Sequence, residues 1–538
     1  MPVPATDLLA RSLVLLIALS WLAWDAPPLK GETPLHQRID LIIAEKAGGS
    51  LAEQATDAEF LRRICLDFAG RVPTSTEVKD FLLDKRADKR TAMIDRLLAD
   101  TRYADRMTDL FNIMLIERRS KHEEWLKFLK ESFAANKPWD QMTREILAPD
   151  VDNESNRGSA MFYTARLEHY GQNPPDVPGL VRDVGRMFLG VDVQCAQCHD
   201  HLFVNDYKQA DYQGLYAFVG TATLRTDLKF PAVSENPLLQ KIAFKSVFAS
   251  DEMKTGPRLP GGNEVEIPAI TKGQEYLVPP DKKLKTPGVL KFSPMRVLAE
   301  TLPRKDNPAF AKNIVNRLWW MMMGRGLVDP LDLHHSDNPP SHPELLDLLA
   351  SEITAHAFDI KWLLRELALS ETYQRSTILP DEAAARAPLA TYRAALERPL
   401  SPTQLLESLL RATGQPVHDA KSVAELRDRF DKAFANPPKE PEVSVAPTVK
   451  GALFFSNDAV VVAWFDRQEN NTVDRLSQLS DAVALVDEAY LTILSRVPTE
   501  LERTDAVRFL KDFAGPRERA ISHLTWAMAS STEFFVNH

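Results

Sequence analysis

Cysteine is scarce in this chain, and so are the signatures of several large protein classes. Only three of the 538 residues are cysteine, too few for the disulfide framework that stabilises small exported domains. The formal net charge is −10, and no basic stripe with interleaved aromatic residues is present, so we expect no nucleic-acid partner. The sequence also lacks a phosphate-binding loop, a G-x-S-x-G elbow and an H-E-x-x-H motif. Its length nevertheless suffices for two or three domains.

Long apolar runs are absent, with one exception near the start of the chain. The run "SLVLLIALSWLAW" (12–24) follows Arg11. It is short for a membrane-spanning helix but has the length of the apolar region of a secretory signal. We therefore expect residues 1–26 to act as a signal peptide or N-terminal anchor, with export to the periplasm or cell surface. Any membrane association would run only through 12–24, and an ordinary apolar N-terminal helix is the alternative.

Helical periodicity dominates the rest of the chain. Apolar residues recur at three- and four-residue steps over 89–100, 343–353 and 359–370, and few stretches alternate with the period of a strand. The sequence therefore predicts a mainly α fold.

The periodicity also suggests how the chain is divided. Helical stripes fade between 222 and 293, where proline, glycine and lysine accumulate. We predict a helical domain over 35–245, a Pro/Gly-rich and mostly irregular linker over 246–290, and a second helical domain over 291–538.

Helix starts are signalled by capping boxes, in which a hydroxyl residue precedes a glutamate or glutamine by three positions. Two such boxes follow a repeated Arg-Val-Pro-Thr motif, at Thr74 with Glu77 and at Thr499 with Glu502. Two more are predicted, one at Ser401 with Gln404 and one at Ser341 with Glu344.

The Arg-Val-Pro-Thr motif indicates a weak internal repeat, a helical hairpin near each end of the chain. In each copy a further helix follows, in which Arg90, Ile94 and Leu97 correspond to Arg517, Ile521 and Leu524. We expect the arginines of the repeat to bind a carboxylate or the C-terminal end of a helix.

The remaining cysteine chemistry lies in one short segment. Cys195-Ala196-Gln197-Cys198-His199 has the C-x-x-C-H pattern that attaches c-type haem. Two thiols one helical turn apart add to the two haem vinyl groups as thioethers, and the adjoining imidazole binds the iron. Cys195 and Cys198 are then the anchors and His199 the proximal ligand. Cys65 lies on an apolar helical stripe, which is typical of a small buried residue.

Three other interpretations of the segment stay open. A redox-active dithiol would close to a disulfide in an exported compartment. A zinc ion would take Cys195, Cys198 and His201, with His199 and His201 as the candidate imidazole ligands of any metal. The two thiols would otherwise form a plain structural disulfide or stay inert.

Several stretches resemble a known group of proteins. They are "DAEFLRRICLDFAGRVPTSTEVKDFL" (57–82), "RDVGRMFLGVDVQCAQCHDHLF" (182–203), and the run from "GRGLVDP" (324–330) to "NPPSHPELL" (338–346). The chain is similar to exported planctomycete proteins that pair two domains of unknown function, a cytochrome-associated domain and its C-terminal companion.

The resemblance implies export, a helical two-domain architecture and a link to c-type haem, but no reaction. Cys195, Cys198, His199 and His201 occupy motif positions of that group. The chain departs from the group after His201, where proline, an aromatic residue and a tryptophan usually follow; here Leu202 and Phe203 follow, with Tyr207 further on.

These observations lead to one expected function and two alternatives. We expect an exported protein with a c-type haem site, used in electron transfer or redox sensing with a redox partner or cell-surface component. The first alternative is a non-enzymatic scaffold or surface-binding module whose C-x-x-C-H-D-H segment is stabilised by zinc or a disulfide. The second is a metal-dependent hydrolase of extracellular polymers, so the sequence leaves open whether the protein is an enzyme.

Overall fold

The structure, a computed structural model, describes residues 33–538 except 169–173, 282, 284–285, 381–386, 417–418 and 441–447. The apolar run at 12–24, predicted to be a signal or anchor, lies outside the described residues. Within the described ranges, no helix is both long enough and apolar enough to cross a membrane.

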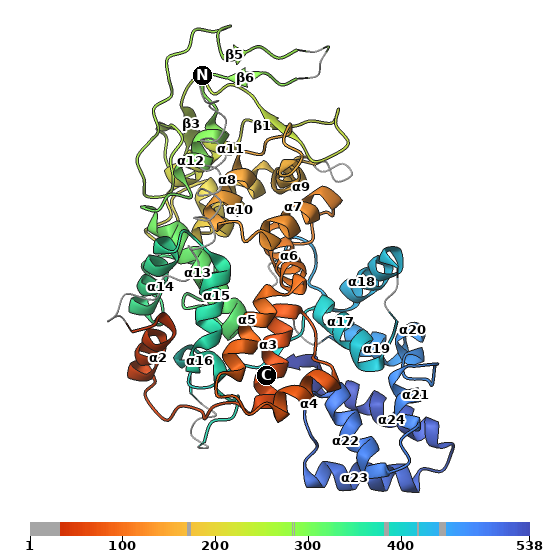
Figure 1. The fold of residues 1–538 in the computed structure, drawn as a ribbon. Helices are drawn as coiled ribbons and strands as arrows, with labels where there is room; N and C mark the ends of the chain where they lie inside the picture. The colour runs from red at the N-terminus through yellow and green to blue at the C-terminus, as the bar shows by residue number, and fades with distance from the viewer. Residues whose placement is uncertain are drawn as a thin grey trace, which may run out of the picture.

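Helices form most of the described chain (Figure 1), which confirms the mainly α prediction. The elements before the irregular segment are α2 (Leu35–Lys46), α3 (Asp57–Ala69), α4 (Ser75–Leu83), α5 (Lys89–Ala99), α6 (Thr101–Ile116), α7 (Glu123–Ala134), α8 (Trp139–Leu147), the 3-10 helix η1 (Arg157–Ala160), α9 (Met161–Leu167), α10 (Val177–Leu189), the 3-10 helix η2 (Gln194–Gln197) and α11 (Gln209–Val219).

The strands are short and pair only in twos within the described residues. Those of the irregular segment form three separate antiparallel pairs: β1 (Ala222–Leu224) with β2 (Val233–Glu235), β3 (Ile242–Lys245) with β4 (Glu252–Thr255), and β5 (Tyr276–Val278) with β6 (Val289–Leu290). Between these hairpins the chain is irregular, as its proline and glycine content predicts.

The remaining elements are α12 (Pro294–Thr301), α13 (Pro308–Met323), α14 (Pro343–Ala355), α15 (Ile360–Leu369), α16 (Glu371–Gln374), the 3-10 helix η4 (Leu389–Thr391), β7 (Arg398–Pro399), α17 (Pro402–Thr413), α18 (Ala420–Phe434), α19 (Val449–Asn457), α20 (Ala459–Ala463), α21 (Thr472–Ser477), α22 (Ala482–Ile493), α23 (Glu500–Asp512), α24 (Arg517–Ala529), α25 (Thr532–Phe535) and β8 (Val536–Asn537). The strand β8 returns to pair with β7.

Three of the four predicted capping boxes are present. Thr74, Ser401 and Thr499 each accept the backbone N–H three residues on, and the side chain at that position accepts the N–H of the cap. The prediction at Ser341 is wrong, because α14 begins one residue later with His342 as its N-cap. Pro343 takes the first helical position, which its fixed φ favours, and so sets the start of the helix.

The internal repeat is a pair of matching helical hairpins, α3–α4–α5 and α22–α23–α24. In each copy, one residue in the left-handed backbone conformation directly precedes the Arg-Val-Pro-Thr motif. This residue is Gly70, with φ 68°, in the first copy and Ser495, with φ 62°, in the second. The motif arginine of the first copy then reaches the glutamate of its own capping box, with Arg71 donating to Glu77 at 2.9 and 3.0 Å. Arg496 makes the same pair of bonds in the second copy, at 2.8 and 2.7 Å.

The arginines in the first turn of the following helices also bind the groups that we expected. Arg90 donates to the Asp57 carboxylate at 2.9 Å. Arg517 donates to the backbone carbonyls of Ser477 and Leu479, at and just beyond the end of α21. Each copy of the repeat is therefore a structural unit that is stabilised by its own arginine–glutamate ion pair and by its own helix contacts.

Two hydrophobic cores hold the molecule together. The larger runs from α2 to α16 and takes apolar residues from both predicted domains, for example Phe188 of α10 and Phe310 of α13. Figure 1 shows how this comes about, with α2 packed beside α14 and α5 beside α15. The smaller core joins the elements after residue 400 to two residues of the first hairpin, Leu66 and Val72.

Candidate functional site

The Cys195–His199 segment is a single 3-10 turn that follows α10. That helix ends at Gly190, which takes the left-handed conformation at φ 73°. Asp192 then accepts the N–H of Gln194 at 2.9 Å and starts the turn η2. Cys195 lies within η2 and Cys198 ends it, and both are exposed free thiols.

Hydrogen bonds from side chains of α11 fix the backbone of the turn. Gln209 donates its amide to the backbone carbonyls of Gln197, at 3.3 Å, and of Lys245, at 3.1 Å. Gln213 donates to the same Gln197 carbonyl at 3.3 Å, and the N–H of Val247 donates to the Cys198 carbonyl at 3.1 Å. The backbone carrying the two thiols is therefore fixed, while the thiols themselves face outward.

His199 is arranged with one ring nitrogen available. Its Nδ1 lies 2.6 Å from the backbone oxygen of Asp200. A carbonyl oxygen only accepts, so Nδ1 carries the proton and, in the neutral ring, Nε2 carries the lone pair. This is the tautomer in which imidazole binds a metal through Nε2 while Nδ1–H donates to a backbone carbonyl.

His201 has the opposite arrangement. Its Nδ1 accepts the backbone N–H groups of Phe203, at 3.2 Å, and Val204, at 2.8 Å. In the neutral ring its Nε2 therefore carries the proton. The predicted zinc ligands Cys195, Cys198 and His201 do not form a ligand set here, since no group of three or more Cys, His, Asp or Glu side chains converges as metal ligands among the described residues.

An apolar rim, Leu202, Phe203, Val247 and Phe248, borders the two histidines. All four side chains are largely exposed, Phe203 most of all at 85%. The Phe248 ring lies 4.8 Å from the His199 ring and the Phe203 ring 6.4 Å from the His201 ring, centroid to centroid. Exposed large apolar side chains gathered at one place are typical of a binding surface.

The segment is joined to residues far along the chain. The hydroxyl of Tyr207, which is buried, donates to the His334 carbonyl at 3.4 Å, and its ring packs edge-on against His335 at 5.4 Å. Asp206 accepts the N–H of Ser336 at 2.5 Å. The loop after α13 therefore supports the far side of the candidate site.

A buried ion network lies behind that loop, and the sequence analysis missed it. Its most enclosed members are four arginines and three carboxylates: Arg119, Arg166, Arg186, Arg317, Glu117, Asp183 and Asp332. Arg182, which is partly exposed, also donates to Asp183 at 3.0 Å. Arg186 donates to all three carboxylates, at 3.0 Å to Asp183, 2.9 Å to Glu117 and 2.9 Å to Asp332. The only signal in the sequence was the presence of charges on the apolar helix α10.

The network sets the charge states of its members. Burial alone would raise the pKa of Asp183, but the surrounding guanidinium groups, that of Arg166 foremost, hold it far below its ordinary value. Burial would lower the pKa of Arg186, and the three carboxylates instead raise it. Asp183 and Arg186 therefore both stay charged near neutral pH.

Comparison with known proteins finds two family models, each described as a protein of unknown function, that match separate parts of the chain. Residues 38–223 match the family model PSCyt2, protein of unknown function (DUF1549), and residues 296–427 match PSD1, protein of unknown function (DUF1553). Searches of the curated proteins and of the solved structures gave no match. The candidate site lies in the first matched region and the loop that supports it in the second. The chain thus carries the paired architecture of these two domains of unknown function.

Proposed function

We propose that the protein is an exported c-type haem protein, used in electron transfer or redox sensing. The observation that carries the proposal is the presentation of two exposed free thiols on one fixed turn, directly before an imidazole whose Nε2 carries the lone pair. Haem attachment needs these three groups in this order.

The residues present fit the group on two further counts. The apolar rim leaves Phe203 and Phe248 exposed beside the two histidines, and a haem bound there would remove apolar surface from water at about 25 cal/mol per Å². The backbone under the thiols is held by Gln209 and Gln213, so the turn that would carry the haem is fixed at its base.

The chain's own residues have distinct roles in this proposal. Cys195 and Cys198 would hold the haem, each adding its S–H across one vinyl double bond so that sulfur bonds to one carbon and hydrogen to the other. His199 would hold the iron through Nε2, and its Nδ1–H donates to the Asp200 carbonyl and orients the ring. When bound, the haem supplies one-electron chemistry whose potential depends on its ligands and burial.

The surface position of the site indicates how it is used. Because the thiols and the apolar rim face outward, electrons would pass to or from a docked redox partner or a cell-surface component rather than a substrate held inside the protein. Export through residues 1–26 belongs to the same proposal.

The direct test is to express the full chain in a host that attaches c-type haem. We expect a red protein that keeps a haem-sized mass increment under denaturing conditions. Serine at both Cys195 and Cys198 should abolish the increment, whereas His201→Gln, the matched control, should leave it intact. A colourless wild-type protein would contradict the proposal.

The alternative is a non-enzymatic surface-binding module, which the exposed apolar rim favours. In this case the segment would be stabilised by zinc or by a disulfide between Cys195 and Cys198. The same preparation distinguishes the two functions, since a colourless protein with one equivalent of zinc, or a mass two hydrogens lower than the reduced chain, would support the module.

A further inference from the structure

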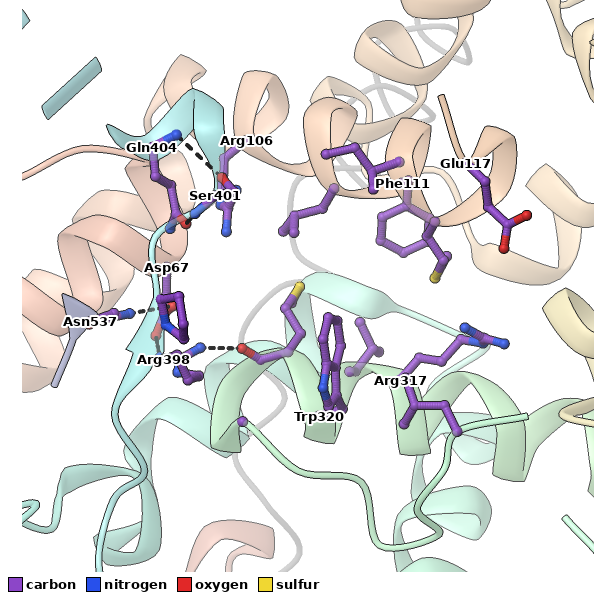
Figure 2. Close-up of a pocket in the computed structure, with 18 of the residues that line it drawn as sticks. Asp67, Arg106, Phe111, Glu117, Arg317, Trp320, Arg398, Ser401, Gln404 and Asn537 are labelled. Carbon is purple, nitrogen blue, oxygen red and sulfur yellow. Dashed lines mark hydrogen bonds and ion pairs between the residues drawn. The ribbon is translucent and has the colours of Figure 1, made fainter. Parts of the chain in front are cut away.

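A pocket of about 350 Å³ opens between α6 and α13, away from the Cys195–His199 turn (Figure 2). Residues of β7 and β8 close one end of it, and the ion network closes the other. The volume falls in the range of small-molecule sites, about 300–1,000 Å³.

The middle of the pocket is apolar and partly aromatic. The helix α6 supplies Leu110, Phe111 and Met114, and α13 supplies Leu318, Trp320 and Met321. Figure 2 shows Phe111 and Trp320 between the two polar ends, one on each helix. Two aromatic rings flanked by leucine and methionine suit a flat, apolar body.

At one end, Glu117 presents an acceptor with no donor. Its side chain is 2% exposed, and its Oε1 accepts from Arg186 at 2.9 Å. Its Oε2 lies 3.6 Å from the nearest guanidinium nitrogen, of Arg119, and receives no hydrogen bond from the residues that the structure describes. Glu117 and Arg118 both take the left-handed conformation, at φ 49° and 54°, a costly arrangement for residues other than glycine.

At the other end, Asn537 presents a second such acceptor. Its side chain is 3% exposed and donates through Nδ2 to Asp67 at 2.9 Å. Its Oδ1 is buried and is without a donor within the described part of the chain. The other oxygen of Asp67 already accepts from Arg398 and from the Tyr373 hydroxyl, both at 2.7 Å. A buried acceptor without a donor is costly, so each of these oxygens suits a donor from a ligand.

The charges around the pocket balance. Four arginines and four carboxylates line it: Arg106, Arg186, Arg317, Arg398, Asp67, Glu117, Asp332 and Glu397. Arg186 and Arg317 already bind Asp332, and Arg398 binds Asp67. An anionic ligand would compete with these carboxylates, and the balanced lining offers a cation no excess negative charge.

We propose that this pocket binds an uncharged, flat aromatic molecule with a hydroxyl donor at each end, that is, a compound of the phenolic class. The aromatic body lies between Phe111 and Trp320, and the hydroxyls donate to Glu117 Oε2 and Asn537 Oδ1. A sugar fits less well, because its ring carries hydroxyls around its whole edge and these would lose their water against Leu110, Met114 and Leu318.

The test uses titration calorimetry on the full chain with 4,4′-dihydroxybiphenyl as probe. Its partners are 4-hydroxybiphenyl, which lacks one donor, and cellobiose, which has hydroxyls throughout. We expect the dihydroxy compound to bind up to about tenfold more tightly than the monohydroxy compound, because it alone can donate to both buried acceptors, and we expect cellobiose not to bind.

Variants locate the interaction. Glu117→Gln keeps an acceptor for Arg186 but replaces the free carboxylate oxygen by an N–H₂ group, so it should weaken binding of the dihydroxy compound about tenfold. Glu123→Gln, on the exposed start of α7, should keep the wild-type affinity. Trp320→Ala should weaken both phenols together, and circular dichroism confirms that each variant is folded. Serine at Cys195 and Cys198 should leave binding unchanged, so this inference fails or succeeds independently of the haem proposal.

Three results would overturn the proposal. They are equal affinity for the two phenols, tighter binding of cellobiose, and wild-type affinity for both phenols in Trp320→Ala.

Discussion

Asp183 is the most enclosed carboxylate of the ion network, and replacing it tests how much that network stabilises the fold. Its side chain is 0% exposed and accepts from Arg166 at 2.8 Å, Arg186 at 3.0 Å and Arg119 at 3.1 Å. Asp183→Asn removes the charge and turns an N–H₂ group towards guanidinium donors. Removing one partner of a buried ion pair costs about 3–5 kcal/mol, and we expect the free energy of unfolding to fall by that amount.

The loss of stability in Asp183→Asn depends on pH, and the lowered pKa of Asp183 determines the direction of that dependence. The pKa of Asp183 in the folded protein lies far below that of the unfolded chain, which is about 3.9. The stability that this carboxylate contributes is therefore present above the unfolded-state pKa and is lost as the pH falls towards the folded-state pKa. The difference between wild type and Asp183→Asn should stay constant near neutral pH and shrink below about pH 4.

The assay is urea unfolding followed by circular dichroism, for both proteins at several pH values. Asp306→Asn is the matched control, since it breaks an exposed pair with Arg304 at 2.7 Å, and such pairs contribute about 0–1 kcal/mol. A loss in Asp183→Asn no larger than in this control would show that the network contributes no net stability. If the stability difference between wild type and Asp183→Asn grew below pH 4, the predicted direction of the pH dependence would be wrong.

Two further predictions follow from local geometry. Thr74→Ala and Thr499→Ala should each lower the free energy of unfolding by about 1 kcal/mol, because each removes the side chain that caps its helix, and Thr→Ser at the same positions should restore it in thermal unfolding. Iodoacetamide at pH 8 should label Cys195 and Cys198 in haem-free protein but leave Cys65 unmodified, because burial raises the pKa of the Cys65 thiol to about 12. The labels are counted by mass spectrometry, and three labels per folded chain would contradict this prediction.

The features that were predictable from the sequence are those encoded over a few residues. The capping box at Thr74 and Glu77, the matching hairpins and the helix over 89–99 all depend on neighbours three or four positions away. The error at Ser341 has the same local origin, since a hydroxyl and a glutamate at the right spacing compete with Pro343 for the helix start.

The features that were missed depend on residues far apart in the chain. Glu117 and Arg186 are 69 positions apart, and Arg398 and Asp67 are 331 apart. No periodicity brings such pairs together before the fold is known, and arginines on an apolar helix are equally consistent with exposed ends of long side chains. The C-x-x-C-H segment was visible, but the placement of Phe248 against His199 was not.

The segment from Asp332 to Ser336 suggests why these two domains occur in one polypeptide. Asp332 neutralises Arg186 of the first matched region, and two to four residues later the same segment contacts Tyr207 and Asp206. In the other direction, Asp67 neutralises Arg398. Each region expressed alone would lose a counter-ion from its interior, so each should behave as an incomplete half, and a gene encoding only one of them would need the other supplied in trans.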